Sequence, residues 1–236
     1  MTSSLSIETR RSNLNAVLGP DIKGLLESTF VRDLEAGRME PGKIWQIFSQ
    51  YRHYCAGFTE FLEILLSRTA SPVAQKPLLE NLWEEKGSGD SMKTHVRMLE
   101  DFVGAWGEAL GKTPESSRAL PSAEAPVAGF VRDIRTHLQS APLPSAFGFI
   151  GPGTEEVTSR QYSRWLRGLK TYGLVESSKL EFFEVHIVAD IQHADHFWQA
   201  LEHVASSEAD WLEVVSGAKR SLRLETQFWN EIVGVK

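Results

Sequence analysis

Apolar residues recur along most of the chain with the spacing of an α-helix. Residues 20–36 show the pattern clearly, because a proline opens them and their apolar positions fall on one stripe with a period near 3.6. The same periodicity predicts helices over the ranges 20–36, 41–68, 73–86, 91–110, 122–140, 141–173, 178–205 and 208–234. The range 141–173 carries a glycine and proline interruption at 151–153. No run of alternating polar and apolar residues indicates a strand, so the pattern predicts an all-α bundle of seven or eight helices.

The length and composition fit one helical domain. The chain has 236 residues, of which 42% are hydrophobic and 24% are charged, and this is enough material for one core. We therefore expect a single domain over residues 1–236, with residues 1–18 as a candidate loose N-terminal segment.

Charge and cysteine content narrow the cellular setting. The net charge is −6 and no run of lysine or arginine stands out, so we expect no nucleic-acid partner. Cys55 is the only cysteine, which excludes an intrachain disulfide and suits a reducing compartment. The N-terminus lacks the apolar core of a signal peptide, and no apolar run approaches the roughly 18 residues of a membrane span. The expectation is a soluble cytoplasmic protein with no membrane partner.

Three side chains that can bind metals interrupt an apolar helical stretch at residues 186–196, HIVADIQHADH. At about 100° per residue, Asp190 lies about 40° and His193 about −20° from His186, so the three share one narrow face. Their apolar neighbours indicate that this face is buried, where an unpaired polar group costs several kcal/mol. A metal ion would compensate that cost, and imidazole with carboxylate suits Fe, Mn or Zn. The alternative is a set of core polar residues satisfied by hydrogen bonds.

Further ligands can come from two other segments. Glu85 and His95 bracket a glycine-rich break between two predicted helices, although an exposed acidic helix end followed by a capped helix would show the same pattern. Glu80 and Glu84 are interpreted as such an exposed end. The segment 151–162 offers Glu155 or Glu156 beside small residues, where the alternative is a surface pair at a helix start.

Together these segments resemble the heme-oxygenase-like diiron oxidases and oxygenases, which share their helical fold with heme oxygenase and the thiaminase-II-like proteins. The resemblance covers roughly residues 45–205 and rests on EEKGSGDSMKTH, GPGTEE and the closing His-x3-Asp-x2-His, in this order. The ligand set that it implies is Glu85, His95, Glu155, His186, Asp190 and His193. One iron would take two histidines with carboxylate and the other iron one histidine, with the mid-chain glutamate shared or swinging between them.

The resemblance leaves two ligand assignments open. Glu155 is preferred to Glu156 because GTE-x6-Tyr, ending at Tyr162, matches the family's run better. Members that act as N-oxygenases have an extra carboxylate on the preceding core helix. Glu60 can fill that place as an additional ligand, and Glu63 competes with it one turn further on.

The resemblance implies a function as well as a fold. The implied function is that of a non-heme diiron oxygenase or oxidase of secondary metabolism. Such an enzyme would activate O2 through a peroxo-diferric intermediate, with no catalytic residues beyond the metal ligands. The expected substrate is a small, amino-acid-derived metabolite, oxidised by N-oxygenation or by C–H or C–C cleavage. The alternatives are a fatty-acid decarboxylating or desaturating oxidase, and a non-catalytic ligand- or protein-binding member of the fold. An external electron donor and a homodimer are further expectations.

Overall fold

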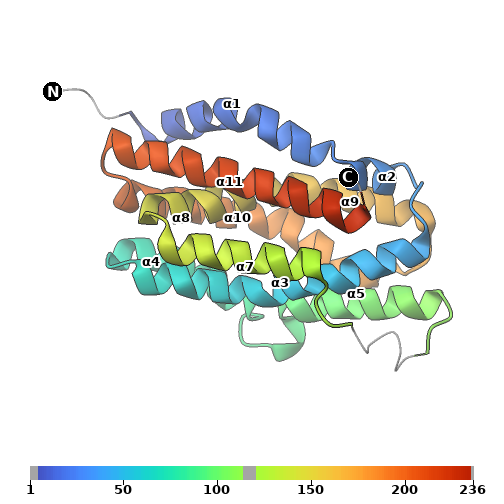
Figure 1. Cartoon of the computed structure of the whole chain (residues 1–236). Coiled ribbons are helices and arrows are strands. Elements are labelled where there is room, and N and C mark those ends of the chain that lie inside the picture. The colour runs from blue at the N-terminus through green and yellow to red at the C-terminus, as the bar shows by residue number, and fades with distance from the viewer. Residues whose placement is uncertain (1–4, 114–120, 235–236) are drawn as a thin grey trace.

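The structure, a computed structural model, describes residues 5–113 and 121–234 (Figure 1). Its elements are α1 (Ile7–Leu26), α2 (Thr29–Glu35), α3 (Pro41–Arg68), α4 (Pro72–Glu85), the 3₁₀ turn η1 (Ser91–Lys93), α5 (His95–Ala109), α7 (Ala125–Ser140), α8 (Leu143–Ile150), the π-helical turn η2 (Gly151–Glu155), α9 (Glu156–Tyr172), the 3₁₀ turn η3 (Ser177–Leu180), α10 (Glu181–Val204) and α11 (Glu208–Val233). These described residues contain no strand, which confirms the all-α prediction.

One face of helix α10 is buried in the bundle and the opposite face is exposed. The helix packs against α9 and α4, while α11 packs against α8 and α1, and α3 packs against α4, α5 and α7 (Figure 1). The buried side chains form one continuous core through these layers. Any side chain on the inner face of α10 is therefore shielded from solvent on several sides.

The N-terminal region differs from the prediction. Helix α1 begins at Ile7, after Ser6 accepts a hydrogen bond from the backbone N–H of Thr9, so residues 7–18 are helical rather than loose. Leu14 and Leu18 are buried, and α1 packs on α11, which explains why this segment is ordered. The range 20–36 consequently divides into the end of α1 and the separate helix α2. The remaining part of the predicted loose segment, residues 1–4, lies outside the described residues.

The interruption at 151–153 is a π-helical turn between α8 and α9. A Cβ atom on Gly151 would lie 2.6 Å from Cβ of Phe197 on α10, and one on Gly153 would lie 2.7 Å from Cβ of Ser221 on α11. The two glycines therefore allow this turn to approach both neighbouring helices. Turns of this kind occur mostly at functional sites, and Glu155 is the last residue of this one.

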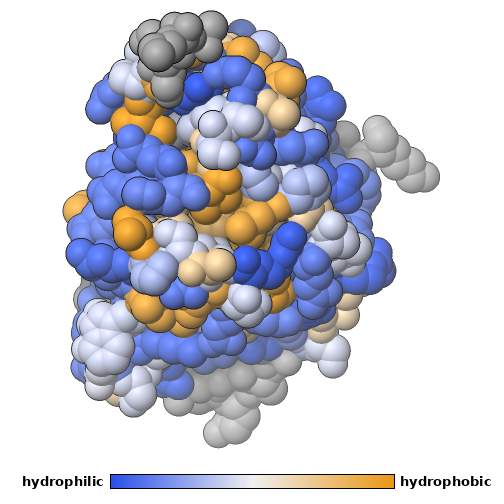
Figure 2. Space-filling view, turned by 90° about the vertical axis from the view of Figure 1, so that its left-hand side faces the viewer, coloured by the Kyte–Doolittle hydropathy of each residue, from blue (hydrophilic) through white to orange (hydrophobic). Residues whose placement is uncertain are grey.

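The surface carries scattered apolar side chains. Figure 2 shows one end of the molecule, where orange apolar patches lie among blue hydrophilic residues. Within residues 5–113 and 121–234, no helix combines the length and the apolar character needed to cross a membrane. The expected homodimer stays a prediction.

Candidate metal centre

Helix α10 presents three of the predicted ligands on one inward face. His186, Asp190 and His193 are buried, with exposed fractions of 7%, 2% and 0%. The structure divides them between two groups, because His193 lies two turns of helix from His186. His186 joins residues from α4 and α5, whereas Asp190 and His193 join Glu155 from η2.

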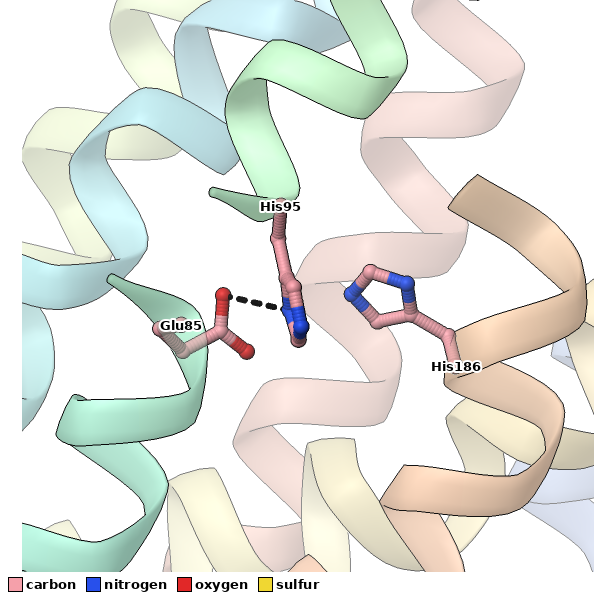
Figure 3. Close-up of side chains that lie close together, drawn as sticks. All are labelled: Glu85, His95 and His186. Atoms are coloured by element: carbon pink, nitrogen blue, oxygen red, sulfur yellow. Dashed lines mark ion pairs between the residues drawn. The ribbon is translucent and has the colours of Figure 1, made fainter. Parts of the chain in front are cut away.

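The first triad consists of Glu85, His95 and His186, whose ligand atoms lie within 4.8 Å of one another. Glu85 ends α4 and His95 begins α5, and the turn between them brings both side chains to one point (Figure 3). Gly87 in this turn has φ 81°, and a Cβ there would meet the carbonyl oxygen of Asp90 at 2.2 Å. The glycine-rich break thus aims the two ligands.

The histidine rings of the first triad are held in defined orientations. Nδ1–H of His186 donates to the carbonyl of Phe182 at 2.6 Å, which leaves Nε2 as the free nitrogen that points toward Glu85 and His95 (Figure 3). Nδ1 of His95 lies 2.9 Å from Oε2 of Glu85, and the centroids of the two histidine rings are 4.3 Å apart. Both imidazoles therefore face the same small volume.

The second triad consists of Glu155, Asp190 and His193, again with ligand atoms within 4.8 Å of one another. Nδ1 of His193 lies 3.6 Å from Oε2 of Glu155 and 3.5 Å from Oδ1 of Asp190. Glu155 and Asp190 are almost fully buried. Two carboxylates thus share a dry site with one imidazole.

Burial sets the proton equilibria of the second triad. It raises the pKa of Glu155, and it raises the pKa of Asp190 to about 8. Burial alone would lower the pKa of His193, but the carboxylates of Asp190, Glu155 and Glu84 outweigh it, and that pKa is raised. The two carboxylates therefore hold negative charge only at a cost unless a cation is present.

Burial affects the pKa values of the first triad differently. Burial lowers the pKa of His186 to about 3, so this imidazole is neutral at ordinary pH. Burial works to raise the pKa of Glu85, but the adjacent His95 outweighs it and the pKa is lowered. A neutral imidazole and an ionised carboxylate are the forms in which these side chains bind metals.

Glu84 is a residue whose role the sequence interpretation missed. It was expected at an exposed helix end, but Nε2–H of His193 donates to Oε2 of Glu84 at 3.0 Å. This contact leaves Nδ1 of His193 free toward Glu155 and Asp190, and carboxylates orient metal-bound histidines in this way. The sequence signal is the pair Glu80 and Glu84, one turn apart, which faces His193 and His196 on α10.

The other candidates lie away from the triads. Glu60 forms an ion pair with Arg135 at 2.7 Å, and Glu63 one with Lys86 at 2.7 Å, so neither carboxylate reaches the two triads. Both side chains are nearly half exposed on α3.

Glu156 also points elsewhere. It accepts hydrogen bonds from Arg11, Asn15 and Trp198, and Asp195 pairs with the same arginine. Of the two adjacent glutamates, the structure brings Glu155 to the metal-binding residues. His196 is buried and donates from Nδ1 to Oδ1 of Asn81 at 2.7 Å, outside both triads.

A small cavity of about 30 Å³ adjoins both triads. Its other walls come mainly from α3, α9 and α10, through Tyr54, Cys55, Phe58, Tyr162 and Phe182. None of the lining residues is a lysine or an arginine. The helix that was expected to supply a carboxylate instead supplies aromatic rings and a thiol.

The unpartnered atoms of the triads fit a metal centre. Oε1 of Glu155, Oδ2 of Asp190 and Nδ1 of His193 are buried without a hydrogen-bond partner, and Nδ1 of His95 also has none of suitable geometry. All four are atoms through which these side chains bind metals. Leaving a buried polar atom unsatisfied costs about 1–3 kcal/mol, a penalty that a bound cation removes. Mixed imidazole and carboxylate ligands suit iron.

Fold and site together define a helical bundle that can hold two metal ions between its core helices. Residues 46–226 match the family described as iron-containing redox enzymes, and the chain belongs to that family. The protein is accordingly an oxidoreductase that contains iron. The family match spans both triads.

Two proteins of known activity are similar in sequence. The 4-aminobenzoate synthase of Chlamydia trachomatis is 27% identical over 192 residues, which cover 80% of this chain and 78% of that protein. The 4-aminobenzoate synthase of Chlamydia muridarum is 23% identical, over 80% of this chain and 76% of that protein.

Solved structures show the same fold at low identity. A CADD-like protein of unknown function from Nostoc punctiforme has a TM-score of 0.78 at 16% identity, covering 97% of both chains. A TenA homologue from Pseudomonas syringae has a TM-score of 0.74 at 14% identity, covering 94% of this chain and 92% of that one. Heme oxygenase from Leptospira interrogans has a TM-score of 0.61 at 15% identity, covering 94% and 98%. The predicted heme-oxygenase-like fold is confirmed.

Proposed function

We propose that this protein is a non-heme diiron oxygenase or oxidase that uses O2 to oxidise a small, amino-acid-derived metabolite. The observation that carries the proposal is the pair of adjacent buried triads with unpartnered ligand atoms, in a chain of an iron-containing redox family. Each triad would hold one iron. Two irons, when bound, supply the electrons that reduce O2.

The side chains around the triads fix the ligands and exclude water. The carbonyl of Phe182 and the carboxylate of Glu84 hold the protons of His186 and His193, so that the opposite ring nitrogens are available as ligands. Tyr54, Phe58 and Phe182 close the cavity, whose volume of about 30 Å³ is close to that of a single water molecule. An organic substrate therefore displaces part of this aromatic wall when it binds.

The charge of the site favours a substrate with a carboxylate. The triads contain three carboxylates, so two Fe(II) ions leave one net positive charge. No lysine or arginine lines the cavity, so a substrate carboxylate would meet the metal ions themselves.

Anaerobic titration of the metal-free protein with Fe(II), followed by exposure to O2, tests the proposal. We expect two irons per chain, and O2 uptake that requires both irons. Zn(II)-loaded protein is the matched control, because zinc fits the same ligands and has no redox chemistry. Binding of one iron or none, or O2 uptake equal to that of the zinc form, would overturn the proposal.

Similarity to the Chlamydia proteins favours a more specific second candidate, the formation of 4-aminobenzoate. The similarity covers 80% of this chain. Chromatography of the iron-loaded, O2-exposed protein tests for the compound, and expression in a bacterial strain that requires 4-aminobenzoate tests for growth. Iron-dependent O2 uptake without product and without growth would exclude this candidate and leave the general proposal standing.

A further inference from the structure

Oxidisable aromatic side chains form a contiguous path through the core from the metal-binding cavity to Trp229 on α11. Tyr162 lines the cavity, and its ring centroid lies 5.3 Å from that of His186 in the first triad. The path continues through Trp165 on α9 and Trp229 on α11, at centroid distances of 4.8 Å and 4.9 Å. We call Tyr51, Tyr162, Trp165 and Trp229 the tyrosine–tryptophan relay.

Tyr51 gives the relay a second connection. Its hydroxyl is hydrogen-bonded to that of Tyr162 at 2.7 Å, and its ring lies 5.1 Å from Trp229. All four relay residues are almost completely buried. Each ring therefore contacts at least one other oxidisable ring without intervening solvent.

Packing alone does not explain these residue types. Nε1 of Trp165 is buried without a hydrogen-bond partner, which costs about 1–3 kcal/mol relative to an apolar ring. Neighbouring positions of the same core are filled by phenylalanine, as at Phe30, Phe48 and Phe183. A phenylalanine at position 165 would avoid the unsatisfied N–H group, which Trp45 outside the relay also has, whereas only an indole at this position can transfer an electron readily.

Trp229, the last residue of the relay, has a proton acceptor beside it. Nε1–H of Trp229 donates to Oε1 of Glu225 at 3.0 Å, and the same oxygen accepts from Gln161 at 2.8 Å. Glu225 as a residue is partly exposed, but burial of its carboxyl group raises its pKa, which favours uptake of a proton. An indole that loses an electron becomes strongly acidic, and here its proton has a carboxylate to move to.

We propose that the tyrosine–tryptophan relay delivers electrons to the oxidised metal centre when no substrate is bound. The proposal rests on the diiron function proposed above. In the net step the metal centre gains one electron, Trp229 loses one electron, and the N–H proton of Trp229 moves to the carboxylate of Glu225. A soluble one-electron reductant, of the ascorbate or thiol class, then reduces the indole, and Glu225 returns the proton. Tyr162 and Trp165 lie between the first triad and Trp229, and the electron passes through them.

Freeze-quench electron paramagnetic resonance tests the relay. Fe(II)-loaded protein is mixed with O2 in the absence of substrate, and the signal is compared between protein with ordinary and with ring-deuterated tryptophan. We expect a radical signal that narrows on deuteration and that is lost in Trp229→Phe. A signal that deuteration leaves unchanged, or no signal despite O2 uptake, would overturn the relay while the diiron function stands. Absence of iron-dependent O2 uptake would overturn both.

Peptide mass spectrometry gives a second readout that is independent of enzyme activity. Tryptic cleavage puts Trp229 in the peptide 224–236, Trp165 in 165–167 and Trp106 in 98–112, each as the only tryptophan. Trp106 is equally buried and its N–H is satisfied by the carbonyl of Pro41, but no ring of the relay contacts it. We expect repeated O2 exposure to oxidise Trp229 and to spare Trp106. Equal oxidation of the two would contradict the relay.

Two conservative variants separate the relay from a structural role. The double variant Tyr51→Phe and Tyr162→Phe keeps both rings, and Trp165→Phe removes an indole whose N–H has no partner. Both should bind two irons. The double variant should lose most of the oxidation at Trp229, and Trp165→Phe, which leaves the connection through Tyr51, should lose part of it. Tyr172→Phe, whose ring contacts Trp106 and lies outside the cavity wall, should keep it. Unchanged oxidation of Trp229 in both relay variants would overturn the proposal.

Discussion

The two triads use the same side-chain chemistry but differ in how far the protein itself satisfies it. In the first triad, His186 donates to a backbone carbonyl, and Glu85 lies 2.9 Å from His95. In the second triad, Glu155 and Asp190 each leave a carboxylate oxygen buried without a partner. In the first triad one imidazole lies close to the single carboxylate, whereas in the second triad one imidazole faces two buried carboxylates at 3.5–3.6 Å.

This difference indicates which half of the centre depends on metal. At Asp190 burial outweighs the adjacent His193 and the pKa is raised, whereas at Glu85 the adjacent His95 outweighs burial and the pKa is lowered. The second triad should therefore destabilise the metal-free protein and gain most from metal binding.

The largest effect is expected from Asp190→Asn. It should reduce iron binding from two ions to one and lower O2-dependent oxidation by more than the roughly 10–100-fold that loss of an outer partner of a ligand costs. In the metal-free protein the same change removes the cost of burying a carboxyl group whose pKa is raised to about 8, so the free energy of unfolding near neutral pH should rise by about 1–3 kcal/mol. Iron analysis and denaturant unfolding measure the two effects.

His186→Ala in the first triad is the matched comparison. It should also remove one iron, but it should lower the stability of the metal-free protein, because it leaves a cavity and deprives the Phe182 carbonyl of its donor. Asp195→Asn is the control on the same helix, since Asp195 pairs with Arg11 outside both triads. If Asp190→Asn and His186→Ala changed metal-free stability in the same direction, the contrast between the triads would be wrong.

Glu84→Gln should act on the second triad alone. Loss of the carboxylate that holds Nε2–H of His193 should weaken metal binding there by about 10–100-fold and leave the first triad unchanged. Titration against a competing chelator separates the two affinities. Glu80→Gln serves as the control because Glu80 lies beside His196, which is outside both triads. Equal weakening by the two variants would contradict the role given to Glu84.

Gly153→Ala tests the backbone that carries Glu155. The added methyl would lie 2.7 Å from Cβ of Ser221 and 2.9 Å from Cα of Ala218, so the π-helical turn must shift, at a cost of about 1–3 kcal/mol. We expect lower thermal stability and loss of the second iron in preference to the first. Gly19→Ala on α1 is the control, because nothing lies within 4 Å of its added carbon. A variant with normal stability and two irons would refute this account of the turn.

The smallest effect is expected from Glu35→Gln. It should lower the free energy of unfolding near neutral pH, whereas Asp190→Asn should raise it. Hydrogen bonds from Arg164 hold the pKa of Glu35 below its usual value, despite some burial, with a further contribution from Arg167. A lowered folded pKa stabilises the protein above the unfolded value and is lost as pH falls through the folded value. Glu35→Gln should therefore cost at most about 1 kcal/mol near neutral pH, and nothing in acid below that lowered pKa. Unfolding measured against pH checks this, and a deficit that grows on acidification would contradict it.

The sequence was sufficient to predict the helices and the residues that gather around the centre. The inward face of α10 followed from the 3.6-residue period, since helical spacing alone aligns His186, Asp190 and His193. The sequence could not show how these residues divide between the two triads, because that division depends on where α4, α5 and η2 meet α10. Residues 7–18 were underestimated because their few apolar positions gain stability only from packing on α11.

The sequence did not predict which face of α3 meets the metal-binding residues. This helix is apolar around much of its circumference, so its periodicity does not identify the face that meets the metal-binding residues. The candidate carboxylates Glu60 and Glu63 lie on its outer side in ion pairs, whereas Tyr54, Cys55 and Phe58 face the cavity. Glu84 was missed for a similar reason, since only tertiary packing brings it to His193.

Anomalous diffraction at the iron edge, from crystals of protein loaded anaerobically with Fe(II), tests the central claim most directly. The account predicts two iron positions per chain, one bound by Glu85, His95 and His186 and the other by Glu155, Asp190 and His193. Their separation should be near the roughly 3.5–4 Å typical of two-metal sites. A single iron position, or iron bound by residues outside the two triads, would contradict it.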